Sequence, residues 1–226
     1  NALLSIKDMQ LTERDLMSGR LYLATQMIRN DVTNYLNKVK DEFKKEDITL
    51  LGNELQLFSR IEIDGERNVV LKGLVDRLQN QNDTVVILDY KTGNVLDGGL
   101  KITRDSLETL FSDPKYKQFV QLIVYTILVK DNNNLQQTDK PVRCGIISIQ
   151  DVNKHSDSYI HYAVLGDREK RSFVNVTDTF DSEQVEDFRK LLTSLLSEIL
   201  NPDIPFRQVA DKKYCKLCDF KHICQR

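Results

Sequence analysis

The chain has 226 residues and a formal net charge of −2, with 40% hydrophobic and 29% charged residues. This composition is typical of a globular protein, and no apolar run approaches the ~18 residues of a membrane span, so we expect no membrane insertion. The nearly balanced charge excludes nucleic-acid binding through bulk positive charge, so such binding would need a local basic surface.

The chain begins with Asn1-Ala2, and asparagine is not a natural start residue. We interpret these two residues as a cloning remnant and the chain as a piece of a longer protein. Nothing near the start combines basic residues with a long apolar core, so we expect no signal peptide and a reducing, cytoplasmic location. We expect one domain over 1–226, with a helical region at 3–47, a core at 48–200 and a cysteine-containing tail at 201–226.

Hydrophobic spacing and turn residues predict helices and strands in a mixed order. Asp113 and Pro114 suit the start of a helix, and Asp181 suits an N-cap. The predicted elements in chain order are a helix at 12–45, strand-like stretches within 48–63, strands at 69–78 and 84–91, a short helix at 106–111, a helix at 113–130, antiparallel strands at 142–149 and 158–165, and a helix at 181–200. This order predicts a mixed α/β (α+β) fold, a central mixed sheet flanked by helices.

Charged residues end a strand that is otherwise apolar. Residues 85–88 are continuously apolar, as in a central strand covered on both faces, and Asp89, Tyr90 and Lys91 follow. Side chains alternate along a strand, so Asp89 and Lys91 point to one face and Tyr90 to the other. Burying an unpaired carboxylate costs several kcal/mol, so these charges need partners or a metal ion.

Asp76 lies on the preceding predicted strand. If the turn spans residues 80–83 and Gln79 pairs with Thr84, Asp76 shares the face of Asp89 at one diagonal step, ~7–8 Å away. A slip of one residue would place Asp76 on the wrong face.

Two carboxylates and a lysine around one point suit phosphodiester hydrolysis. Carboxylates hold Mg²⁺, which lowers the pKa of its water and neutralises charge on the phosphate. The lysine can orient or deprotonate that water, or stabilise charge in the transition state. A structural ion pair near a turn explains the same spacing equally well.

The motifs resemble those of RecB-like nucleases of the PD-(D/E)XK superfamily, which have a restriction-endonuclease-like core. Residues 73–77 (Gly-Leu-Val-Asp-Arg) and 87–93 (Ile-Leu-Asp-Tyr-Lys-Thr-Gly) are similar to the paired signature of that family. Gln121 and Tyr125 resemble its helical Gln-x-x-x-Tyr motif, and Glu54 resembles the acidic residue that precedes the first signature.

The resemblance implies that Asp76 and Asp89 bind Mg²⁺ or Mn²⁺ and that Lys91 is the catalytic lysine. It also implies that the carbonyl of Tyr90 adds a ligand, with Glu54 as an auxiliary candidate for the same metal shell.

Gln121 and Tyr125 are four residues apart on a predicted helix, so they share one face. The resemblance implies that they face the cleft and contact DNA or steady the lysine. Tyr125 also has apolar neighbours, which is typical of a core residue. Three nearby lysines would line either a phosphate track or an ordinary solvated helix face; they are Lys115, Lys117 and Lys130.

The tail carries Cys215, Cys218 and Cys224, and a Cys-x-x-Cys pair is strong metal-ligand spacing. The tail resembles that of AddB-type proteins, which implies a 4Fe–4S cluster in the full-length protein that is incomplete here. Zinc, with His222 as a further ligand, and no metal at all are the alternatives. Cys144 lies in a predicted strand and is typical of a buried small hydrophobe.

We therefore expect a Mg²⁺-dependent deoxyribonuclease for DNA repair or recombination, as part of a helicase–nuclease. The alternatives are a catalytically inactive DNA-binding or scaffold domain with the nuclease fold, and a zinc-binding interaction module built on the tail. The joint presence of Asp76, Asp89 and Lys91 favours the enzyme. RecB-like nucleases also have an upstream helical histidine, which the predicted helix at 12–45 lacks, and this argues against full activity of the chain.

Overall fold

A computed structural model describes most of the chain. The described residues are 17–63, 65, 67–93, 95, 97–135, 139–154, 159–209, 211–215, 218 and 220–225. Four parts of the predictions lie outside them: the cloning remnant at 1–2, residues 3–16 of the N-terminal helical region with the start of its helix at 12–16, residue 158 of a predicted strand, and residues 210, 216, 217, 219 and 226 of the tail.

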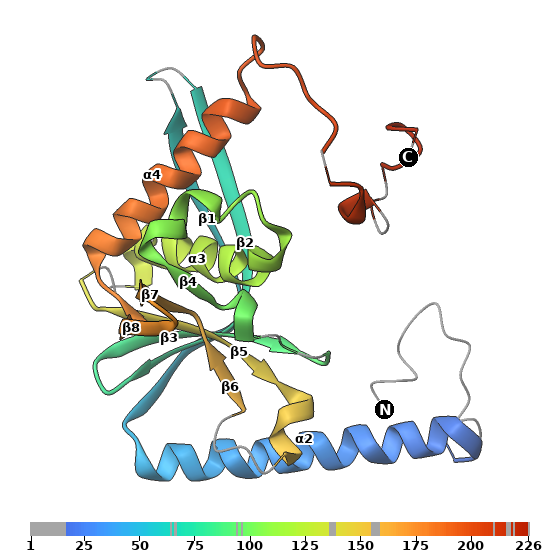
Figure 1. The fold of residues 1–226 in the computed structure, drawn as a ribbon. Coiled ribbons are helices and arrows are strands. Elements are labelled where there is room, and N and C mark those ends of the chain that lie inside the picture. Colours follow the sequence, from blue (N-terminus) through green and yellow to red (C-terminus); the bar gives the residue numbers. More distant parts are fainter. Residues whose placement is uncertain are drawn as a thin grey trace.

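The central sheet mixes antiparallel and parallel strands, which confirms the predicted fold class (Figure 1). Its strand order is β1-β2-β3-β5-β6, with β9 beside β5. β3 and β5 are parallel, whereas the other neighbours are antiparallel. The strands of this sheet are β1 (Ile48–Ile63), β2 (Arg67–Gln81), β3 (Thr84–Lys91), β5 (Val142–Ser148), β6 (Ile160–Tyr162) and β9 (Thr179–Phe180).

A second sheet of three strands was not predicted. It consists of β4 (Lys101–Thr103), β7 (Val164–Glu169) and β8 (Ser172–Thr177). The single strand predicted at 158–165 is wrong, because the chain changes sheets at Ala163. The N–H of Ala163 donates to the carbonyl of Cys144 in the central sheet, whereas that of Val164 donates to the carbonyl of Leu100, next to β4.

Helices cover both faces of the central sheet (Figure 1). α3 (Lys117–Lys130) and α4 (Ser182–Ile199) pack on one face of the sheet and enclose the larger of two clusters of buried hydrophobic residues. α2 (Gly19–Lys45) packs on the other face and encloses the smaller cluster. Alternate residues of β3 enter the two clusters, so β3 is covered on both faces as its apolar run predicted.

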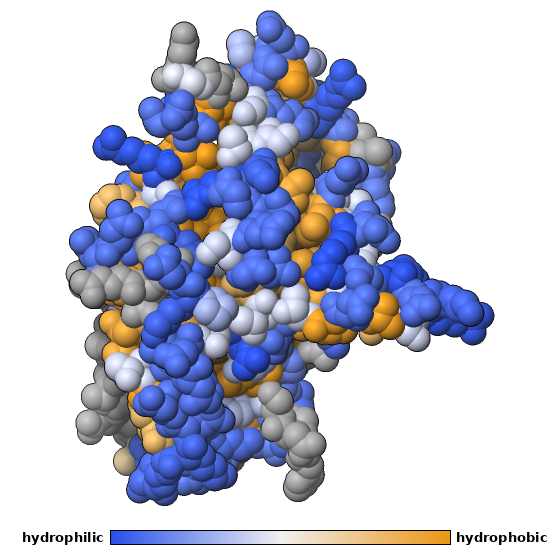
Figure 2. All heavy atoms as spheres, turned by 90° about the vertical axis from the view of Figure 1, so that its left-hand side faces the viewer, coloured by the Kyte–Doolittle hydropathy of each residue, from blue (hydrophilic) through white to orange (hydrophobic). Residues whose placement is uncertain are grey.

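The outer surface is mixed in character. The face in Figure 2 is largely hydrophilic, with hydrophobic side chains in separate patches. None of the helices in the described part of the chain has the length and apolar character that crossing a membrane requires.

Local signals set the helix starts close to their predicted positions. Asp113 accepts a hydrogen bond from the N–H of Lys115, which opens a 3-10 turn (Pro114–Tyr116) before α3. Asp181 and Gln184 form a reciprocal capping box at the start of α4. Such caps satisfy backbone N–H groups that have no partner within the helix.

The turn between β2 and β3 is two residues shorter than predicted. Gln81 pairs with Thr84, so only Asn82 and Asp83 form the turn, and both have positive φ angles of 49° and 63°. Asn and Asp tolerate this left-handed conformation, which two-residue hairpin turns require. The observed register differs from the predicted one by two residues. Because side chains alternate along a strand, a shift of two residues leaves Asp76 on the predicted face of β2.

Candidate active site

The centre of the site is the carboxyl group of Asp89, near the end of β3. Asp89 is 2% exposed, and its Oδ2 lies 2.7 Å from Nζ of Lys91. Its Oδ1 accepts a hydrogen bond of 2.9 Å from Nε2 of Gln121 on α3. Burial raises the pKa of Asp89 and so does the negative charge of Asp76, whereas Lys91 and Gln121 lower it; the net direction is upward.

Asp76 lies where β2 and β3 stop pairing. The last pair of that ladder is Arg77 with Leu88, and continuing the register places Asp76 opposite Asp89. The predicted diagonal step between the two aspartates is therefore wrong, because the turn is shorter. Asp76 Oδ2 accepts a hydrogen bond of 2.8 Å from the backbone N–H of Tyr90, which ties the strands together just beyond their last pair.

Glu54 lies on β1 at the level of Asp76. Asn53 pairs with Arg77 and Leu55 with Val75, so Glu54 is the residue of β1 that faces Asp76. Its φ of 48° is unusual for a strand residue and changes the direction of its side chain. An open depression of about 510 Å³ is lined by Asn53, Glu54, Asp76 and Tyr90.

α3 supplies the polar side chains above the end of β3. Nε2 of Gln121 donates to Asp89 and also to the hydroxyl of Tyr125, at 2.8 Å. A Cβ on Gly73 would lie 2.9 Å from the Tyr125 ring, so only glycine lets β2 approach α3 this closely. Tyr125 packs against the core, and its hydroxyl accepts a hydrogen bond from Gln121; a contact of Tyr125 with DNA or with the lysine stays a prediction.

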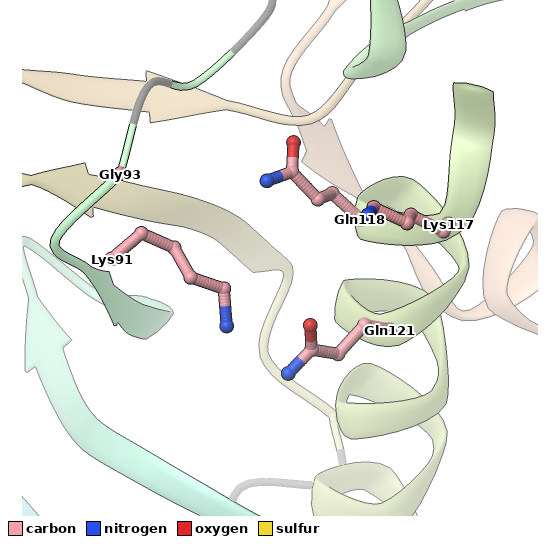
Figure 3. A pocket seen from close by; sticks show the side chains of 5 residues that line it. All are labelled: Lys91, Gly93, Lys117, Gln118 and Gln121. Atoms are coloured by element: carbon pink, nitrogen blue, oxygen red, sulfur yellow. The ribbon is translucent and has the colours of Figure 1, made fainter. Parts of the chain in front are cut away.

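Lys91 links the carboxylates to a second depression. Its side chain is 35% exposed although Nζ is paired with Asp89. The depression has a volume of about 390 Å³, and Figure 3 shows Lys91 and Gln121 approaching each other across it. Its lining residues are Lys91, Gly93, Lys117, Gln118 and Gln121.

The opposite face of the strands is fixed by a set of contacts that the sequence did not predict. Tyr35 of α2 shares a hydrogen bond of 2.8 Å with the hydroxyl of Tyr90 and accepts one of 3.0 Å from Arg77. Arg77 is 4% exposed. Burial and the contact with Tyr90 raise the pKa of Tyr35, so it remains a neutral hydroxyl. Arg77 belongs to a sequence motif, but nothing in the sequence pairs it with a tyrosine 42 positions away.

The oxygen donors around Asp89 suit a hard divalent cation. Repulsion between Asp76 and Asp89 contributes to the raised pKa of Asp89, and a cation between them would remove it. No group of three His, Cys, Asp or Glu side chains comes together as a metal site within the described residues. Mg²⁺ fits this arrangement, because it keeps several waters and binds through one or two carboxylates plus substrate phosphate.

The tail cysteines show no such convergence in the part of the tail that the structure describes. Cys215, Cys218 and Cys224 are partly buried free thiols. Cys144 is fully buried, and burial raises its pKa to about 12, which confirms the expected small hydrophobe. It is therefore poorly suited to complete the ligand set of the tail.

A comparison with known proteins agrees with this geometry. A search of curated proteins found no match to the chain. The family model of the PD-(D/E)XK nuclease superfamily, in contrast, matches residues 5–225, which is nearly the whole length. The chain therefore belongs to the PD-(D/E)XK nuclease superfamily.

Proposed function

We propose that this chain is a divalent-metal-dependent deoxyribonuclease that hydrolyses phosphodiester bonds, with Asp76, Asp89 and Lys91 as its catalytic core. The observation that carries the proposal is the state of Asp89. Its carboxyl group is buried, its pKa is raised by burial and by Asp76, and its oxygens already contact Lys91 and Gln121. A buried carboxyl group whose pKa stays raised beside a second carboxylate, in a nuclease fold, is typical of a functional site and suits a cation.

Asp76, Asp89 and the carbonyl of Tyr90 would hold Mg²⁺ or Mn²⁺, and Glu54, in the same depression as Asp76, is an auxiliary ligand. When bound, the ion supplies Lewis-acid stabilisation of the charge on the phosphate. Gln121 holds the orientation of Asp89 through one hydrogen bond, and Tyr125 holds Gln121 through another.

Lys91 has the position expected of the group that handles the attacking water. Nζ lies 2.7 Å from Asp89, at the border between the carboxylates and the depression beside α3. From there the ammonium can orient the water, accept its proton after passing its own to a neighbouring base, or stabilise charge on the phosphate.

The motifs support a finer assignment to the RecB-like nucleases. We propose that the nuclease acts in DNA repair or recombination alongside a helicase. The joint presence of the two aspartates and the lysine favours this enzyme over an inactive DNA-binding or scaffold domain of the same fold.

We further propose that the tail thiols Cys215, Cys218 and Cys224 are ligands of a 4Fe–4S cluster whose fourth ligand comes from outside this group. Iron quantification and visible absorbance of the freshly purified full-length protein test this, whereas the 226-residue chain alone should hold no intact cluster. A stable zinc content and no iron would reassign the tail to a zinc site.

The test of the main proposal is a digestion assay on linear DNA in Mg²⁺, in Mn²⁺ and in EDTA. We expect cleavage with either metal ion and none in EDTA, and Asp76→Asn serves as the inactive control. Equal cleavage by wild type and Asp76→Asn would point to a contaminating nuclease and remove the support for the proposed site.

A further inference from the structure

We propose that the depression beside α3 binds a backbone phosphate of the DNA next to the phosphate that is cleaved, with Lys117 and Gln118 as the recognising residues. The inference rests on the proposed nuclease function, because Lys91 lies at the edge of this depression. It selects Lys117 from the three lysines that the sequence offered for a phosphate track, and it adds Gln118, which the sequence did not indicate.

The chemistry of the lining matches a phosphate. Among the described lining residues, two carry ammonium groups, two carry carboxamides and the fifth is a glycine, so no carboxylate is among those described. Gln118 and Gln121 extend from α3 toward the end of β3, where Lys91 lies, as Figure 3 shows. Ammonium and amide N–H groups donate hydrogen bonds, and an ionised phosphate accepts several such bonds at once.

The depression adjoins the proposed site of the reacting phosphate but has a different lining. Lys91 and Gln121 both contact Asp89 and line this depression, whereas Asp76 lines the other depression. Lys117 and Gln118 begin α3, and the positive end of the helix dipole favours an anion there. A strand whose scissile phosphate lies at the aspartates would therefore place a neighbouring phosphate beside α3.

The structure distinguishes Lys117 from the two other lysines near this helix. Lys115 is paired with Asp113 at 3.0 Å and lies over the ring of Tyr116. Lys130 donates a hydrogen bond of 2.6 Å to the carbonyl of Lys140. Lys117 is exposed, and among the described residues it has no ion-pair partner. Of the three, it alone lines the depression.

Gly93, just after the end of β3, presents no side chain to the depression. Among the described atoms, none would lie within 4 Å of a Cβ on Gly93. The carbonyl of the preceding residue, Thr92, accepts a hydrogen bond of 2.8 Å from Gln150. A ligand on this side of the depression would therefore meet no side chain of residue 93.

The experiment compares Lys117→Ala with Lys115→Ala, which removes the same charge two residues away. Binding of fluorescently labelled single-stranded DNA is measured by anisotropy in EDTA, so that cleavage does not interfere, over a series of salt concentrations. We expect Lys117→Ala to weaken binding about ten-fold, as for one lost hydrogen bond to a charged group. The slope of log affinity against log salt should fall by about 0.7 in magnitude, the value for one phosphate contact on a single strand.

Lys115→Ala should leave the slope unchanged, and Lys117→Arg should restore it. Equal losses in both alanine variants would show that only net charge matters and would overturn the proposal, as would an unchanged slope in Lys117→Ala. Circular and 5′-hydroxyl DNA should show the same loss, because a deficit confined to 5′-phosphorylated ends would assign the depression to a terminal phosphate instead. Since the readout is binding, a failure of the nuclease proposal in the digestion assay remains a separate result.

Discussion

Two buried aspartates lie at the ends of neighbouring parallel strands of the sheet, and their pKa values shift in opposite directions. Asp89 lies near the end of β3, whereas Asp151 lies in the 3-10 helix (Ile149–Asn153) after β5. Burial raises the pKa of Asp89, and the contacts with Lys91 and Gln121 do not offset it. Burial acts in the same direction on Asp151, but its hydrogen bonds lower the pKa to about 2.

The difference lies in the partners of each carboxylate. Asp151 is paired with Lys154 and lies 2.8 Å from Nε2 of His161. Asp89 has one cation and one amide, and it faces a second carboxylate at Asp76. A buried acid with all its partners stabilises the fold, whereas one with too few is a candidate for binding a cation.

The largest effect is expected from Lys91→Ala. Removal of a group that assists proton transfer or stabilises the transition state should lower the cleavage rate by about 10²- to 10⁴-fold. DNA binding should change little, because it draws on many phosphate contacts. The measurement is metal-dependent digestion of linear DNA beside a binding titration, and undiminished cleavage would remove Lys91 from the mechanism.

Asp151→Asn should lower the free energy of unfolding at neutral pH by about 2 kcal/mol, because the pKa of Asp151 is about 2 in the fold against an ordinary 3.8. A carboxyl group with a lowered pKa stabilises the fold above its unfolded pKa and loses that contribution as pH falls through the folded value. The difference in the free energy of unfolding between wild type and Asp151→Asn should therefore narrow as the pH falls from about 4 to 2. Urea unfolding at a series of pH values measures it, and a gap independent of pH would contradict this account.

A smaller effect on stability is expected on the opposite side of β3 from the site, where the hydroxyl of Tyr35 forms hydrogen bonds with Tyr90 and Arg77. Tyr35→Phe should lower the free energy of unfolding by about 1 kcal/mol, the net value of a typical hydrogen bond. Tyr22→Phe, on the exposed part of the same helix, is the matched control and should change nothing. A loss of equal size in the control would show that the effect does not arise from the cluster around Arg77.

Sequence patterns predicted the elements that depend on local signals. The apolar run before Asp89, the cap at Asp181 and the helix that carries Gln121 all follow from neighbouring residues. The predicted turn of four residues was wrong, because β2 pairs with both β1 and β3 as far as Gln81. Only Asn82 and Asp83 then remain for the turn, and this length of pairing is what requires their left-handed backbone.

Other features depend on contacts between residues that are distant in the sequence, so local patterns could not predict them. The three lysines near α3 are equivalent in sequence, and only the positions of Asp113 and Lys140 separate Lys117 from the rest. The partners of Asp151 likewise come from β6 and from the residue after the 3-10 helix, and no motif marks their convergence. The second sheet was missed because the change of sheets at Ala163 leaves no signal in the hydrophobic pattern.

The most direct test of the central claim is Asp89→Asn, measured for both cleavage and stability. The pKa of Asp89 is raised in the fold, so the charged form costs stability above the folded pKa, and the neutral amide should remove that cost. In EDTA at neutral pH, we predict a free energy of unfolding equal to or above that of the wild type, together with a loss of cleavage of at least about 100-fold in Mg²⁺. A variant that is destabilised like Asp151→Asn, or that still cleaves DNA at the wild-type rate, would contradict the assignment of Asp89 to the metal site.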